Sequence, residues 1–275
     1  MDKELLRIAK EAGKILMKHH RKKIEIKSKS KDFFNPVSIA DLESNEYISS
    51  SLQKLYPHIS ILSEENIPNE INFSSPLWII DPLDGTNEFI TGREQFSVII
   101  CLLKNSTPYL GIVYEPYTDI LYFAKKCKGA FKERNNRVEK LQVSKISKIK
   151  EAKCIVRSSY VNKNKFDAFI DKLSVKEKVE QSSIGLRLCA IADKRGDFYI
   201  NSVILASKWD TSAGQIILEE AGGKITDIKG NPLNYNQKNL AWESSFIASN
   251  KALHNSILEI IPPNAVSLMK PVTKT

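Results

Sequence analysis

The stretch Trp78-Ile79-Ile80-Asp81-Pro82-Leu83-Asp84-Gly85-Thr86-Asn87-Glu88 contains the most informative pattern in this chain. An apolar run ends at Asp81, a proline follows that should break the strand, and a second aspartate comes three positions after the first. Gly85 and Thr86 then stand where a loop could turn into a helix. Carboxylates at a strand end suit a hard cation, and amides at a helix start suit a phosphate. The pattern therefore predicts a site for a cation and a phosphoryl group.

Two further acidic residues lie at predicted element boundaries before this stretch. Asp41 follows Ser38 in a pattern typical of a capping box, which on its own is a complete structural explanation. Glu64 follows an apolar strand predicted over 59–62, at a strand end where α/β proteins bind ligands. A solvated loop acid is the structural alternative for Glu64.

A third acid, Asp210, lies in the sequence Trp-Asp-Thr-Ser-Ala-Gly at the start of a predicted helix. The helix dipole favours an acid in this first turn in any case. Asp81 and Asp84, however, would repel each other without a counter-ion. We therefore interpret the acids together as a Mg²⁺ site completed by a substrate phosphate.

Haloacid-dehalogenase-type phosphatases offer a rival interpretation, because they carry Asp-x-Asp-Gly-Thr with a nucleophilic aspartate. Here Pro82 and Leu83 separate the two aspartates, which are three positions apart rather than two. A covalent aspartyl-phosphate is therefore disfavoured.

Composition limits the remaining function classes. The chain has 275 residues, 42% hydrophobic and 27% charged, as expected for a folded protein. The charge of +9 favours anionic partners or simply a lysine-rich surface, and no nucleic-acid-binding motif accompanies it. The four cysteines form no CxxC pair, the N-terminus is charged, and no apolar stretch approaches a membrane span. We expect a cytoplasmic protein with no zinc, no nucleic-acid partner and no integral membrane segment, and leave peripheral association with the inner membrane open.

The hydrophobic periodicity predicts two regions that differ in their order of elements. Residues 1–150 are expected to form an α+β domain, an antiparallel sheet with helices on one face. Residues 151–275 are expected to alternate strands and helices as a second α/β domain. The expected helices are 2–20, 38–55, 163–173, 185–194, 209–221 and 251–260. The expected strands are 22–29, 59–62, 77–81, 96–103, 109–115, 120–125, 129–132, 138–143, 153–157, 197–201, 224–227 and 245–248.

Taken together, these motifs resemble the inositol monophosphatase superfamily of metal-dependent, lithium-sensitive phosphatases. In chain order, the match comprises the acidic segments 36–41 and 63–65, residues 78–86, and residues 209–214 continuing to Gly222-Gly223. Within the superfamily, Asn87-Glu88-Phe89-Ile90 and the segment 111–116 are most similar to the bacterial 3′(2′),5′-bisphosphate nucleotidases. That branch removes one phosphate from adenosine 3′,5′-bisphosphate, a by-product of sulfate activation.

The resemblance implies a layered α-β-α-β-α sandwich and assigns roles by position. The implied Mg²⁺ ligands, for two or three ions, are Glu64, Asp81, the Leu83 carbonyl, Asp84 and Asp210. Asp41 and Thr86 would orient and deprotonate the attacking water, with Glu64 also counted among the catalytic residues. Gly85, Thr86, Arg187 and Asp210 would contact the substrate.

Three positions depart from the nucleotidase pattern. Tyr160 stands where a histidine is expected, Asn201 where an arginine is expected, and Arg187 in place of a lysine. Arg187 could bind a second phosphate in bidentate fashion, and an arginine on a helix surface is the alternative. These departures affect substrate choice and leave the predicted chemistry unchanged.

The sequence therefore predicts a Mg²⁺-dependent phosphomonoesterase for adenosine 3′,5′-bisphosphate, present as a monomer or homodimer. An inositol monophosphatase or broad sugar-phosphate phosphatase is the nearest alternative. A basic nucleic-acid-binding protein with a relict metal site is the alternative from another class.

Overall fold

The computed structural model describes residues 2–22, 26–28, 36–157, 165–201, 206–262 and 265. The helices are α1 Lys3–His19, α2 Ile39–Leu55, α3 Thr86–Ile90, α4 Lys165–Asp171, α5 Ile184–Ala192, α6 Lys208–Glu220 and α7 His254–Ile260, with a 3₁₀ turn at Ile149–Glu151. The first strands are β1 Ile26–Ser28, β2 Pro36–Ser38, β3 Ser60–Ser63, β4 Leu77–Asp84, β5 Ser97–Lys104, β6 Thr107–Glu115, β7 Ile120–Lys125, β8 Ala130–Arg134 and β9 Arg137–Lys140. The later strands are β10 Lys153–Val156, β11 Glu177–Glu180, β12 Phe198–Ile200, β13 Lys224–Asp227 and β14 Phe246–Ser249.

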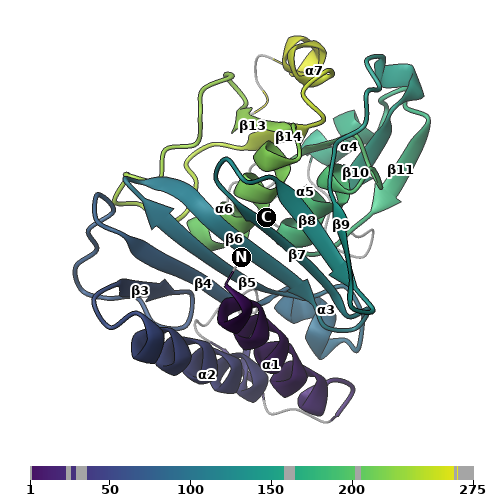
Figure 1. Cartoon of the computed structure of the whole chain (residues 1–275). Helices are drawn as coiled ribbons and strands as arrows, with labels where there is room; N and C mark the ends of the chain where they lie inside the picture. The colour runs from purple at the N-terminus through teal and green to yellow at the C-terminus, as the bar shows by residue number, and fades with distance from the viewer. Residues whose placement is uncertain are drawn as a thin grey trace, which may run out of the picture.

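Two main sheets alternate with three layers of helices (Figure 1). The larger sheet has seven strands in the order β3-β4-β5-β6-β7-β8-β9, and the smaller has five in the order β11-β10-β12-β14-β13. Helices α1 and α2 cover the outer face of the larger sheet, and α4 and α7 pack on the outer face of the smaller one. Helices α5 and α6 lie between the sheets. The predicted α-β-α-β-α sandwich is confirmed.

The larger sheet is covered by helices on both faces: α1 and α2 from residues 1–150 lie on one face, as expected, and α5 and α6 from the second half of the chain lie on the other. Trp78 and Ile80 of β4 pack in the cluster with α1 and α2, whereas Ile79 packs in the cluster with α5 and α6. All eight residues of β4 are buried. A continuous apolar run such as 77–80 is typical of a strand buried on both faces, and it was the signal for the second helix layer.

Strand β4 continues through Pro82, although the proline was expected to end it. Asp81 pairs with Ile99 of β5, and Asp84 pairs with Ser97. Between these two pairs β4 advances by three residues, whereas β5 advances by only two. The extra residue on β4 makes this a β-bulge, a place in a strand where proline is tolerated. In a regular strand, residues three apart point to opposite faces. The extra residue turns Asp84 to the face of Asp81, towards α5 and α6.

Other differences lie at the edges of the sheets. Strand β11 was not predicted, because this edge strand is mostly exposed and lacks an apolar pattern. Only 26–28 of the strand expected over 22–29 is a described strand, and part of the remainder lies outside the described residues. The cluster between the sheets draws residues from both halves of the chain, and the division near residue 150 stays a prediction. Within the described ranges, no helix has the length and apolarity needed to cross a membrane.

Candidate active site

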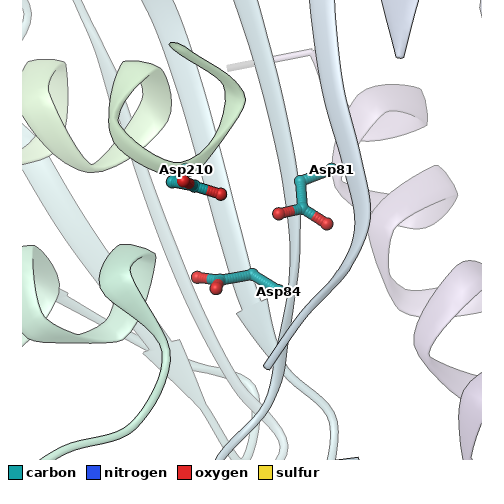
Figure 2. A group of neighbouring side chains, drawn as sticks. All are labelled: Asp81, Asp84 and Asp210. Carbon is teal, nitrogen blue, oxygen red and sulfur yellow. The ribbon is translucent and has the colours of Figure 1, made fainter. Parts of the chain in front are cut away.

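Three aspartates from two distant parts of the chain meet between the larger sheet and the helix layer. Asp81 and Asp84 come from the bulged end of β4, and Asp210 comes from the first turn of α6 (Figure 2). One carboxylate oxygen from each lies within 4.8 Å of the others. Asp81 is 1% exposed and Asp84 is 8% exposed. The structure thus brings together three of the five implied metal ligands.

Two of the carboxylates are held by main-chain amides close to them in the sequence. The Leu83 N–H donates to Asp81 Oδ1 at 3.0 Å. The Ser207 N–H donates to Asp210 Oδ2 at 2.6 Å, in a capping box at the start of α6. Each carboxylate therefore has one oxygen fixed by its local backbone, which orients the group before any cation arrives.

Asp84 is held instead by the start of α5, from the other half of the chain. The Gly185 N–H and the Ser183 hydroxyl donate to Asp84 Oδ2 at 2.8 and 2.5 Å. The Ser183 oxygen lies 2.9 Å from the Ser97 hydroxyl oxygen and accepts from the Leu186 N–H. The sequence did not predict that Ser183 and Gly185 hold Asp84. A serine just before a predicted helix did indicate that Ser183 caps the helix, but not that it also contacts Asp84.

The electrostatics of the cluster fit a divalent cation. Burial first, and then the charges of neighbouring acids, raise the pKa of Asp81 and of Asp210 well above the usual range. Burial also raises the pKa of Asp84, opposed by the bonds from Ser183 and Gly185 and by the charge of Arg187. The ionised cluster is therefore unfavourable alone, and a cation would offset the repulsion. Carboxylate oxygens are the ligands that hard cations such as Mg²⁺ prefer, so the residues fit the predicted metal.

Glu64 lies beside the three aspartates at the end of β3. Its N–H donates to the Ile80 carbonyl at 3.1 Å, which places it next to Asp81 across the parallel β3–β4 pair. Its charge contributes to the raised pKa of Asp81 and of Asp210. Glu64 therefore lies next to the cluster, although the oxygens that lie within 4.8 Å of one another belong to the three aspartates, and its role as a metal ligand stays a prediction.

Asp41 has the capping role expected for it, and its catalytic role stays a prediction. Its Oδ2 accepts from the Ser38 N–H at 2.8 Å and from the Ser38 hydroxyl, which completes the capping box of α2. Its Oδ1 lies 3.5 Å from the Thr86 hydroxyl oxygen, which also donates to the Leu83 carbonyl at 3.1 Å. The capping box thus orients Asp41 so that its other oxygen faces Thr86. Thr86 begins α3 directly after Gly85, whose φ of 98° favours glycine.

Arg187 is 7% exposed, which rules out the helix-surface alternative. Its Nε donates to the Gln181 carbonyl at 2.7 Å, and its Nη2 donates to the Ser182 carbonyl. Its Nη1 donates to the Tyr199 hydroxyl at 2.6 Å. Tyr199 donates in turn to Asn201 Oδ1 at 2.9 Å. Arg187 therefore braces the segment before α5, and its substrate contact stays a prediction. Tyr160 lies outside the described residues.

Comparison with known proteins places the chain in a family. The profile of the inositol monophosphatase family matches residues 1–264, so the chain belongs to that family of phosphatases. The 3′(2′),5′-bisphosphate nucleotidase CysQ of Aggregatibacter actinomycetemcomitans is 33% identical over 247 residues, covering 89% of this chain and 90% of the relative. The fructose-1,6-bisphosphatase/inositol-1-monophosphatase of Thermotoga maritima is 30% identical over 258 residues, covering 93% of each chain. Among solved structures, a Thermotoga maritima IMPase superposes with a TM-score of 0.82 at 27% identity, covering 96% of this chain and 97% of that one.

Proposed function

We propose that this protein is a Mg²⁺-dependent phosphomonoesterase that hydrolyses adenosine 3′,5′-bisphosphate to AMP and phosphate. The observation that carries the proposal is the convergence of Asp81, Asp84 and Asp210 beside the Asp41–Thr86 pair. The similarity to a bisphosphate nucleotidase over most of both chains supports the choice of substrate.

The side chains have separate tasks in this proposal. The three aspartates and Glu64 hold the cation, which polarises the phosphate and stabilises charge on the leaving oxygen when bound. Asp41 accepts a hydrogen bond from Thr86, so the Thr86 oxygen can accept one from the attacking water. The Gly85 and Thr86 amides hold the transferred phosphate in this proposal, at the residues that lead into α3. Water forms the new P–O bond as the bond to the nucleoside oxygen breaks. The proton of the water passes by way of the Thr86 hydroxyl to Asp41, and the leaving oxygen takes a proton from solvent water.

A second candidate is an inositol monophosphatase or broad sugar-phosphate phosphatase using the same chemistry. The buried network of Arg187, Tyr199 and Asn201 favours it, because Asn201 stands where the nucleotidases are expected to carry an arginine. The similarity to the Thermotoga maritima enzyme points the same way.

Comparison of kcat/KM on different substrates separates the two candidates. We expect the highest value with adenosine 3′,5′-bisphosphate, and lower values with inositol 1-phosphate and fructose 1,6-bisphosphate, all at saturating Mg²⁺. A higher kcat/KM with inositol 1-phosphate would reject the proposed substrate in favour of the second candidate.

A further inference from the structure

Lys208 is a fully buried lysine at the first position of α6, two residues before Asp210. Both features are unfavourable, because a buried cation is costly and the start of a helix repels positive charge. Its Nζ donates to the Tyr235 carbonyl at 2.9 Å and to the Gln237 carbonyl, and lies 4.0 Å from the centroid of the Phe73 ring. None of these partners is an acid, so an ion pair with them does not explain why a lysine is buried at this position.

The carbonyls bound by Lys208 belong to residues 235–242, a segment of the connection between β13 and β14 that we call the clip. The backbone of the clip pairs with the residues just before Asp210. The Lys208 N–H donates to the Leu240 carbonyl at 3.0 Å, and the Trp242 N–H donates to the Ala206 carbonyl at 2.8 Å. Ser207 forms a β-bridge with Ala241. The start of α6 is therefore fixed by the clip.

Two aromatic side chains of the clip reach the residue just after Asp210. The hydroxyl oxygens of Tyr235 and Thr211 lie 3.1 Å apart, and Trp242 Nε1 donates to the Thr211 hydroxyl at 3.1 Å. The two aromatic rings meet edge to face with centroids 5.0 Å apart. The clip thus contacts the chain on both sides of Asp210.

We propose that Lys208 is a positioning residue that holds the clip against the first turn of α6, so that the Asp210 carboxylate faces Asp81 and Asp84. The inference deepens the proposed function, since it concerns the same cation site. A lysine has three donors and can satisfy both carbonyls at once. An apolar side chain of similar length would leave both carbonyls without this partner and the clip less firmly held. The cost falls mainly on the Tyr235 carbonyl, whose contact with Lys208 is buried, whereas the contact with the Gln237 carbonyl is partly buried.

Lys208→Met tests this role with Mg²⁺ alone as the ligand. We expect the Kd for Mg²⁺, measured by titration calorimetry and by the Mg²⁺-dependent shift in Tm, to rise by about tenfold or more. At saturating Mg²⁺, we expect kcat to stay within a few-fold of the wild-type value. Leu253→Ala is the matched control, because Leu253 is fully buried in the cluster beneath α7. That control should lower Tm while leaving the Kd for Mg²⁺ unchanged.

A Lys208→Met protein with a lowered Tm and a Kd for Mg²⁺ within about twofold of wild type would overturn the proposal. Should this variant fail to fold, Trp242→Phe removes one hydrogen bond of the clip and keeps most of the apolar surface. The Kd should then rise by about threefold, in line with one lost bond, and an unchanged Kd would reject the role of the clip. These readouts need no substrate, so inactivity of the wild type on adenosine 3′,5′-bisphosphate would reject the proposed function alone.

Discussion

At the scale of single residues, Asp41 combines an observed capping role with a proposed chemical role. Its capping bonds to Ser38 fix one oxygen, and its other oxygen faces the Thr86 hydroxyl. The sequence predicted each role separately. The structure shows how the capping bonds orient the second oxygen towards Thr86, as the proposed chemical role requires.

Thr86→Ala tests the chemical half of that role. We expect kcat to fall by about a hundredfold or more, because the hydroxyl that would accept a hydrogen bond from water is lost. Thr86→Ser should keep most of the activity. Thr91→Ala is a matched control on the same short segment, since the Thr91 hydroxyl bonds only to main-chain carbonyls in the described contacts. Equal effects of Thr86→Ala and Thr91→Ala on kcat would contradict the assignment.

At the scale of elements, the start of α5 and the end of β4 form one unit. Gly185 permits their close approach, because a Cβ there would lie 2.7 Å from Ile99 Cδ1 and 3.3 Å from Asp84 Oδ2. This contact could not be predicted from the sequence, since residues 183–187 are separated from Asp84 by about a hundred positions. Arg187 of this segment was instead expected to contact the substrate.

Gly185→Ala should displace α5 from Asp84, lower Tm and weaken Mg²⁺ binding. The overpacking should cost about 1–3 kcal/mol of unfolding free energy, measured by urea denaturation. Ile99→Val removes the clashing Cδ1, so the double variant should recover part of the stability. A double variant no more stable than Gly185→Ala would show that this contact is not the cause.

Helix α7 begins with a buried histidine that gives stability a defined pH dependence. His254 is 1% exposed, and its ring nitrogens lie 2.8 Å from the Thr226 hydroxyl oxygen and 2.9 Å from that of Ser249. Burial lowers the pKa of His254 from 6.5 to about 4. His254 binds a proton more readily in the unfolded chain than in the folded protein. The contribution of neutral His254 to the unfolding free energy is therefore complete above pH 6.5 and is lost as pH falls towards 4.

We expect this histidine to account for up to about 3 kcal/mol of lost unfolding free energy over that pH range. Urea unfolding at several pH values should show a shallower decline in His254→Gln than in the wild type. His58→Gln is the control, because His58 is exposed. Parallel declines in wild type and His254→Gln would contradict the assignment.

At the scale of the whole molecule, the two halves of the chain meet at the cation site. The order of the acidic motifs was enough to predict the family and the layered fold. It was not enough to predict the bulge at Pro82. The bulge depends on the pairing between β4 and β5, which local sequence patterns do not specify.

Removing the metal should therefore affect the stability of the whole protein. The raised pKa values of Asp81 and Asp210 mean that the metal-free fold binds protons more tightly than the unfolded chain. Proton binding by Asp81 and Asp210 therefore stabilises the metal-free fold at low pH. This stabilisation is lost as pH rises through the raised pKa values of the two groups. The increase in Tm caused by Mg²⁺ should accordingly grow with pH, and a pH-independent increase would contradict the account.

Phosphate release by Asp84→Asn shows whether the three-aspartate cluster is the site of phosphate hydrolysis. The wild type should release phosphate from adenosine 3′,5′-bisphosphate only with Mg²⁺. Folded Asp84→Asn should lose about a thousandfold or more of kcat, because the cation contributes several kcal/mol to catalysis. Turnover that persists without Mg²⁺, or that Asp84→Asn leaves unchanged, would contradict the claim.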